Sequence, residues 1–165
     1  MRARFVTTRF LIATFACLSL LGFGARAGDP AGVYSRTTSL PLDQAYTRLY
    51  EALEAERFWV VFESDMGSRM ESMRERWGAD YNRHNLTGVR SMVFCNLDWT
   101  HRVANAAPEL LALCPLHLSV YGQDGQTVVV MPRPSAIAAG SDGATTASEL
   151  ETQLIGVIDA ALRGD

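Results

Sequence analysis

The residues best able to do chemistry lie within one stretch, residues 94–121. This stretch contains two cysteines, Cys95 and Cys114, and two histidines, His101 and His117. Thiolates and imidazoles are nucleophiles, bases and metal ligands, and two thiols can also close a disulfide. A run of β-forming residues borders the stretch at each end. Which of these chemistries is available therefore depends on how the two bordering strands pair.

The N-terminus has the pattern of a secretory signal peptide. Three arginines precede an apolar run at residues 10–23, and Ala25-Arg26-Ala27 then supplies a small-residue cleavage signal before Gly28. The run is shorter than the ~20 apolar residues that span a bilayer. We therefore predict a signal peptide at residues 1–27 and a secreted or periplasmic single domain at residues 28–165 without a membrane span.

Removal of this leader makes the protein more acidic. The whole chain has 15 basic and 18 acidic residues. Four of the arginines lie in residues 1–27, so 11 basic residues remain and the net charge is about −7. An acidic domain does not attract phosphate backbones or anionic lipids, which argues against nucleic-acid and membrane-surface binding.

Export favours a disulfide between Cys95 and Cys114, because an oxidising compartment pairs the two cysteines that remain after cleavage. If strands at 89–94 and 116–121 pair with Cys95 opposite Cys114, Val93 faces Leu116 and one face is apolar on both strands. Opposed strand positions lie within disulfide range. Closing this loop contributes about 3 kcal/mol in the chain-entropy model.

The same register predicts a second site on the other face. It places Met92 across from His117, and thioether and imidazole together suit haem or copper. The chain lacks C-x-x-C-H, C-x-x-C and H-E-x-x-H motifs, so the cofactor stays unknown. Thiol-redox chemistry at Cys95 and Cys114 with a histidine base is a further alternative. No complete catalytic signature is present, which favours a non-enzymatic role.

Three more binding candidates lie between the two strands. Asn96 suits a turn, where its side chain satisfies backbone groups or contacts a ligand. Trp99 and His101 could cover a pocket or a partner, or could plug the edge of the sheet. A small ligand is therefore among the expected partners. The polar loop at residues 80–84 is expected to face solvent.

Hydrophobic periodicity predicts the elements that position these residues. We expect helices at 42–57, 68–77 and 148–162, and strands at 33–38, 58–63, 89–94, 116–121 and 127–131. Residues 58–63 (FWVVFE) indicate a buried strand, and the Met70, Met73 and Trp77 stripe indicates a core helix face. The Asp124-Gly125 turn predicts a hairpin.

This order predicts an α+β two-layer sandwich, with a mainly antiparallel sheet of four to five strands and helices on one face. The uncovered face is then an expected homodimer interface.

Several segments resemble the "domain of unknown function 302" family, over about residues 33–138. Met92–Leu97 (MVFCNL) resembles its Gly-Asn-Pro element, and Ala107–Leu116 (APELLALCPL) resembles its aPe…LP element. Cys95 stands where Gly is usual and Leu97 where Pro is usual. The resemblance implies a small α+β domain, sometimes a dimer, and transfers no catalytic residues. It implies an uncharacterised binding or accessory protein.

Overall fold

The computed structural model describes residues 30–163, so the predicted signal peptide lies outside the described residues. Each predicted helix and strand has a counterpart, although the helix predicted at 68–77 is divided. The elements are β1 (Val33–Thr38), α1 (Leu42–Ala55), β2 (Trp59–Asp65), α2 (Met66–Glu71), α3 (Arg74–Trp77), η1 (Gly78–Asp80), β3 (Thr87–Cys95), α4 (Leu97–Ala106), η2 (Pro108–Leu113), β4 (Leu116–Gln123), β5 (Gln126–Pro132), α5 (Pro134–Ile137) and α6 (Ala144–Ala161).

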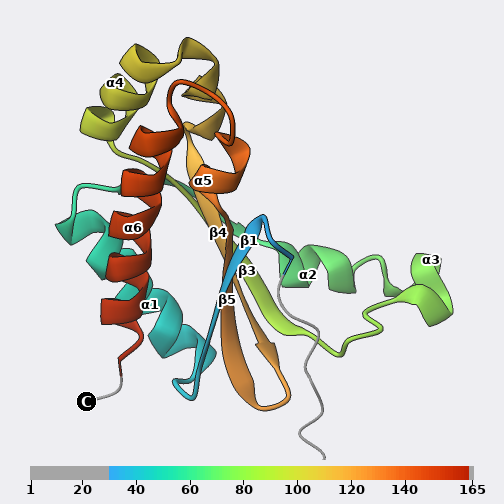
Figure 1. Cartoon of the computed structure of the whole chain (residues 1–165). Coiled ribbons are helices and arrows are strands. Elements are labelled where there is room, and N and C mark those ends of the chain that lie inside the picture. Colours follow the sequence, from blue (N-terminus) through green and yellow to red (C-terminus); the bar gives the residue numbers. More distant parts are fainter. Residues whose placement is uncertain (1–29, 164–165) are drawn as a thin grey trace, which may run out of the picture.

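The five strands form one antiparallel sheet in the order β1-β5-β4-β3-β2. Helices α1 and α6 cover one face of this sheet, and α2 and α3 project on the other side (Figure 1). The predicted α+β sandwich with a five-stranded antiparallel sheet is confirmed, and α1 and α6 are the helices that pack on the covered face. No helix within residues 30–163 is long and apolar enough to cross a bilayer.

The covered face of the sheet forms the core. Met92 and Phe94 on β3, and Leu118 and Val120 on β4, are buried on this face. They belong to one hydrophobic cluster with α1 residues such as Leu49 and with apolar residues of α6. Phe58 packs edge-to-face against Phe94, with ring centroids 6.0 Å apart. The helical spacing of apolar residues in α1 and α6 thus places both helices against a single layer of strand side chains.

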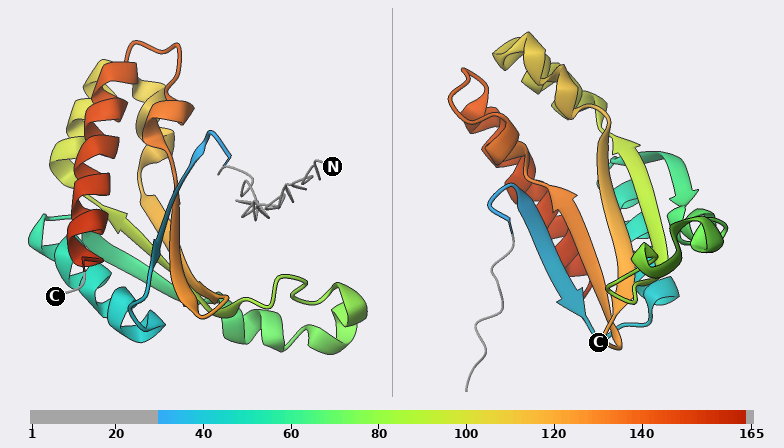
Figure 2. Two further views of the ribbon diagram at one scale, coloured as in Figure 1. Left: turned by 60° about the horizontal axis from the view of Figure 1, so that its bottom comes forward. Right: turned by 90° about the vertical axis from the view of Figure 1, so that its right-hand side faces the viewer.

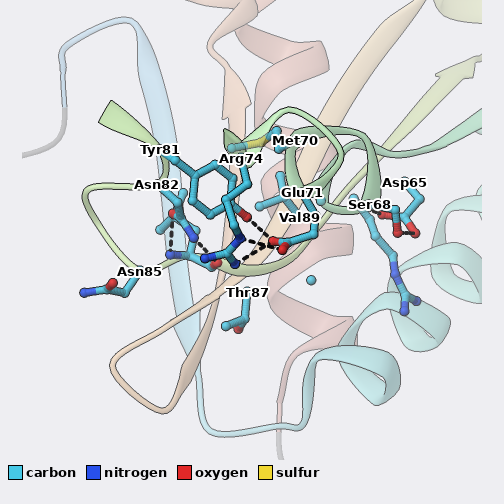
Figure 3. A pocket seen from close by; sticks show the side chains of 14 residues that line it. Asp65, Ser68, Met70, Glu71, Arg74, Tyr81, Asn82, Asn85, Thr87 and Val89 are labelled. Atoms are coloured by element: carbon cyan, nitrogen blue, oxygen red, sulfur yellow. Dashed lines mark hydrogen bonds and ion pairs between the residues drawn. The ribbon is translucent and has the colours of Figure 1, made fainter. Parts of the chain in front are cut away.

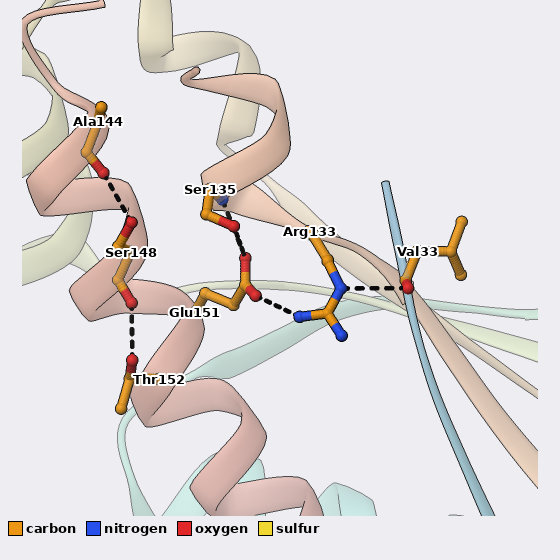
Figure 4. A network of polar contacts seen from close by, with 7 residues as sticks. All are labelled: Val33, Arg133, Ser135, Ala144, Ser148, Glu151 and Thr152. Carbon is orange, nitrogen blue, oxygen red and sulfur yellow. Dashed lines mark hydrogen bonds and ion pairs between the residues drawn. The ribbon is translucent and has the colours of Figure 1, made fainter. Parts of the chain in front are cut away.

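One buried carboxylate ties the C-terminal helix to the sheet (Figure 4). Glu151 on α6 accepts from Arg133 at 2.5 Å, from the Ser135 backbone N–H at 3.0 Å, and from the Ser135 hydroxyl. Arg133 also donates to the Val33 carbonyl of β1 at 3.2 Å. Burial acts to raise the pKa of Glu151, but the Ser135 and Arg133 contacts outweigh it, and the pKa is lowered. The network therefore joins β1, β5, α5 and α6 around an ionised carboxylate.

The prediction of a buried strand at FWVVFE is wrong. Residues Trp59–Asp65 form β2 at the edge of the sheet, and Trp59, Val61 and Phe62 are 49, 63 and 59% exposed. The register shifts between Val60 and Phe62, which leaves Val61 as a bulge. On the outer edge the Val60 N–H donates to the Glu54 carboxylate at 2.7 Å. An apolar run alone cannot distinguish a central strand from an edge strand with an uncovered face.

The predicted core stripe in residues 68–77 is also wrong. Helices α2 and α3 contain no buried residue, and Trp77 is 42% exposed. Trp77 instead stacks on Tyr81, with ring centroids 6.4 Å apart. Residues 66–86, which we call the excursion, leave the sheet after β2 and return at the start of β3 (Figure 2). Met70, Met73 and Trp77 belong to this projecting segment rather than to the core.

Candidate functional site

The pairing of β3 with β4 removes the predicted Met92–His117 site. Met92 pairs with Leu118, and Val93 pairs with His117. The register therefore differs by one residue from the one anchored on Cys95 opposite Cys114, and a one-residue shift exchanges the faces of a strand. Met92 is fully buried against the helices, whereas His117 is exposed on the open face. The two side chains cannot ligate the same haem or metal ion.

The two cysteines nevertheless come together, by a different route. The β3–β4 ladder ends at the Phe94–Leu116 pair, so neither cysteine belongs to it, and the Cys114-Pro115 peptide bond is cis. Thr100 of α4 lies between the cysteines, with its hydroxyl oxygen 3.3 Å from Cys95 Sγ and 3.4 Å from Cys114 Sγ. Both thiols are free and half-buried. The crossover thus contains a convergent Cys–Thr–Cys cluster.

Asn96 fixes the helix that supplies Thr100. Its side chain accepts from the Trp99 N–H at 3.1 Å and donates to the Glu56 carbonyl at 3.3 Å. Asn96 is 5% exposed. It is the N-cap of α4, and a capping side chain satisfies a backbone N–H that the helix leaves without a partner. These contacts give Asn96 a positioning role at the thiol cluster.

Trp99 and His101 point to different surroundings. Trp99 is buried, donates from Nε1 to Gln153 at 2.8 Å, and has the Arg102 guanidinium 4.0 Å above its ring. His101 is exposed and contacts Asn105 on the same helix at 3.0 Å. Of the predicted binding residues, Asn96 is therefore bonded to the thiol cluster through Thr100, whereas Trp99 and His101 bond to Gln153 and Asn105 instead.

No histidine is hydrogen-bonded to either thiol within the described residues. That part of the chain also contains no group of three His, Cys, Asp or Glu side chains placed to hold a metal ion. Burial is the largest cause that raises the pKa of Cys114, and the neighbouring Cys95 adds to it against the lowering effect of Thr100. The geometry suits reaction between the two sulfurs better than base-assisted covalent catalysis.

The open face of the sheet is a second candidate surface (Figure 2). The register places on it the following strand residues, none of which is Asp, Glu or Arg: Val33, Ser35, Thr37, Trp59, Phe62, Ser64, Ser91, Val93, His117, Ser119, Tyr121, Gln123, Gln126, Val128, Val130 and Pro132. The charged strand residues Arg36, Glu63, Asp65 and Arg90 alternate onto the helix side. His117 lines a shallow hollow of about 190 Å³ on this face with Val33 and Val130.

A groove between α2 and residues 81–90 was not predicted from the sequence (Figure 3). Its volume is about 720 Å³. Asn82 shapes one wall by bonding both the N–H and the carbonyl of Leu86 at 2.8 Å. The side chains of Asn85 and Thr87, which also line the groove, make no hydrogen bond within residues 30–163. Asn82 and Asn85 both adopt positive φ in this loop, a conformation that Asn tolerates, so the asparagines of residues 82–85 are a sequence signal for a turn here.

The charged groups of the groove all have polar partners within residues 30–163. Glu71 accepts two bonds from Arg74, at 2.6 and 2.8 Å, and another from the Tyr81 hydroxyl. The Arg74 and Tyr81 contacts lower the pKa of Glu71 to about 2. Arg90 pairs with Asp43 at 2.8 Å, and Asp65 accepts from Ser68. The groove is therefore polar, and its two acidic and two basic lining residues leave no net charge to attract a charged ligand.

The fold and its surfaces define a small α+β sandwich with one uncovered sheet face and a dithiol at the β3–β4 crossover. The family model described as "Domain of unknown function DUF302" matches residues 34–161, and the chain belongs to this family. The match includes the closing helix α6, beyond the residues 33–138 suggested by the sequence motifs.

A solved structure supports the fold. The "crystal structure of uncharacterized conserved protein DUF302 from Bacillus stearothermophilus" aligns with a TM-score of 0.69 and 22% sequence identity. The alignment covers 81% of this chain and 100% of that one. A search of curated proteins finds no match.

Proposed function

We propose that this protein is an exported binding or accessory module whose working surface is the open sheet face. The observation that supports the proposal is the composition of that face, which combines exposed Trp59 and Phe62 with neighbours that include no Asp, Glu or Arg. A solvated sheet face of a monomer normally alternates polar residues outward. An uncharged, partly aromatic face is instead typical of the core of a protein interface.

The occupant that we propose is a second copy of the chain. The mature protein has a net charge of about −7, so two copies repel each other. This repulsion is weakest when the surfaces that meet carry no charge. Most homo-oligomers are two-fold dimers in which one patch contacts itself, and an uncharged face is electrostatically compatible with itself. A charged partner would find no complementary charge on this face.

The area of the open face is smaller than the area that a stable dimer buries, so a further segment is needed at the interface. Five strands about 4.8 Å apart and about six residues long present roughly 500 Å² in plan. Stable complexes bury about 800 Å² per partner. The excursion projects on the same side of the sheet (Figure 2), and its exposed Trp77 offers additional apolar area. We expect the excursion of one copy to contact the other.

Light scattering coupled to size-exclusion chromatography tests this proposal. We expect a dimer for the wild type and a monomer for Val93→Arg, which places a charge on the face between Phe62 and His117. Arg36→Glu, on the covered side but partly exposed, is the control that should leave the mass unchanged. A wild-type monomer at ~100 μM, above the Kd range of ordinary complexes, would contradict the dimer.

Export is tested independently. Fractionation should recover the protein outside the cytoplasm with Gly28 as its first residue, and we expect Cys95 and Cys114 to be oxidised to a disulfide there. An N-terminus at Met1 on the protein from a secretion-competent host would contradict the export proposal without affecting the dimer.

The groove supports a second candidate function, the binding of a small neutral polar ligand. Its volume lies within the range of ligand sites, and the Asn85 amide and Thr87 hydroxyl are available as hydrogen-bonding groups. A neutral oligosaccharide matches this lining better than an ion, because Glu71, Arg74 and Arg90 are already paired.

Titration with maltotriose should shift the Asn85 side-chain amide resonance, and Asn85→Ala should abolish the effect. Absence of a shift at about 10 mM, near the weak limit of specific binding, would remove this candidate.

A further inference from the structure

We propose that Cys95 and Cys114 form a redox-active dithiol, in which Cys95 is the attacking thiol and Cys114 is the resolving thiol. The proposal deepens the expected disulfide of an exported protein by assigning different roles to the two sulfurs. It rests on the proposed export only for its physiological setting, because the chemistry can be tested with purified protein.

The convergence of both sulfurs on one hydroxyl is the first observation. Thr100 Oγ lies 3.3 Å from Cys95 Sγ and 3.4 Å from Cys114 Sγ. The same hydroxyl also lies 2.9 Å from the Asn96 carbonyl oxygen. A hydroxyl has only one hydrogen to donate, so it cannot serve Asn96 and Cys114 together. Thr100 therefore holds the thiols close to each other without committing them to permanent partners.

The surroundings of the two thiols differ. Cys114 packs against the hydrophobic core cluster, between the buried Leu113 and the cis Pro115. Cys95 ends β3 beside the edge strand, where its partner Trp59 is half exposed. Burial also raises the pKa of the Cys114 thiol. Because the thiolate is the nucleophile, Cys95 is the sulfur that an external oxidant meets first.

The reaction proceeds in two balanced steps with an external disulfide as oxidant. The Cys95 thiol loses its proton to water and attacks one sulfur of the oxidant, whose S–S bond breaks and releases one thiolate. Cys114 then loses its proton, attacks Cys95 Sγ and displaces the second thiolate. Two protein thiols become one disulfide, and the oxidant disulfide becomes two thiols.

This disulfide would close the β3–β4 crossover. The crossover consists of α4 and η2, which lie between the two cysteines in sequence. A bond between the sulfurs would replace the contacts through Thr100 and would join the end of β3 directly to the start of β4. The thiol state would then control the rigidity of this crossover.

Glutathione disulfide is the probe that tests the pair. Incubation of the reduced wild-type protein should lower its intact mass by two hydrogen atoms and remove both alkylatable thiols. Cys114→Ser should accumulate a glutathione adduct on Cys95, whereas Cys95→Ser should form the adduct on Cys114 at least about five-fold more slowly, as expected for a thiol that packs against the core and whose pKa is raised. Circular dichroism confirms that each variant is folded.

A measurement on the wild type avoids dependence on the variants. Brief alkylation of the reduced protein, followed by peptide mapping, should label Cys95 before Cys114. Equal or reversed labelling would overturn the assigned roles. Recovery of two free thiols at every ratio of reduced to oxidised glutathione, including oxidised glutathione alone, would overturn the pair itself. Neither result depends on where the protein is located, so failure of the pair is distinguishable from failure of the export proposal.

Discussion

The two faces of the sheet are built from the same strands but are used in opposite ways. On β3, Met92 and Phe94 point to the helices and are fully buried, whereas Ser91 and Val93 point to the uncovered side and are half-buried. The covered face also takes the charged strand residues, such as Arg36, which pairs with Asp159 of α6 at 3.3 Å. The buried contacts are therefore concentrated on the covered face, whereas the strand residues of the open face carry no Asp, Glu or Arg.

The largest expected effect on the free energy of unfolding comes from comparing two phenylalanines on opposite faces. Phe94→Ala should lower the free energy of unfolding by about 3–5 kcal/mol, because it leaves a cavity in the core. Phe62→Ala should lower it by no more than about 0.5 kcal/mol, because Phe62 is 59% exposed. Urea unfolding at one low protein concentration measures both values. Equal losses would mean that the open face is covered within the monomer.

The next test concerns the buried carboxylate on the covered side. Glu151→Gln should lower stability by roughly 2–4 kcal/mol, since it leaves the Arg133 charge poorly compensated. The exposed Glu149, which pairs with Arg102 on the same helix, provides the control, and Glu149→Gln should change stability by less than about 1 kcal/mol.

The same carboxylate predicts a pH dependence. The pKa of Glu151 is lower in the folded protein than its ordinary value, so the unfolded chain binds this proton more readily. The contribution of Glu151 is therefore complete above the pKa of an unfolded Glu, near 4.5. It is lost as the pH falls through the lower, folded pKa. A Glu151→Gln variant should lose less stability than the wild type between neutral and acidic pH.

A smaller effect is expected at the crossover that follows β3. Asn96→Ala should cost about 1–2 kcal/mol, because it removes the N-cap of α4 and the bond to the Glu56 carbonyl. The variant should also change the alkylation rates of Cys95 and Cys114, since Asn96 positions the helix that holds Thr100. Asn96→Asp retains a capping oxygen and should recover most of the stability. The alkylation rates of its two cysteines should still differ from those of the wild type.

The smallest effect is expected in the excursion. Arg74→Ala removes the Glu71 pair but no buried contact, so the midpoint of urea unfolding should not change measurably. Hydrogen exchange should nevertheless become faster in α2 and α3, because local opening does not need the core to unfold. A large loss of global stability would show that the excursion belongs to the cooperative core.

The sequence predicted the elements of this fold better than their pairing. The bounds of β1 and the hairpin between β4 and β5 follow from local turn and periodicity signals. Residues 89–94 contain apolar side chains at both parities, so alternation could not choose the buried face. The predicted register was anchored instead on Cys95 opposite Cys114, and it was one residue away from the observed one.

The thiol cluster was predicted in part, and the groove was not. Two cysteines were expected to meet, but Thr100 was missed because its role depends on how α4 turns back over the end of β3. The groove depends on the packing of α2 beside Val89, where Gly67 approaches the Val89 backbone closely. Such a contact between distant segments leaves no periodic signal in the chain.

The Glu54 side chain covers part of the outer edge of β2 and limits the pairing of that edge with further strands. Glu54 accepts from the Val60 N–H, and the bulge at Val61 interrupts the strand beside it. An exposed apolar edge strand is otherwise a template on which further strands add without limit. With this N–H occupied, growth by edge-to-edge addition at β2 is hindered. The chain can thus expose Trp59 and Phe62 on an edge strand with a reduced tendency to form fibrils through that edge.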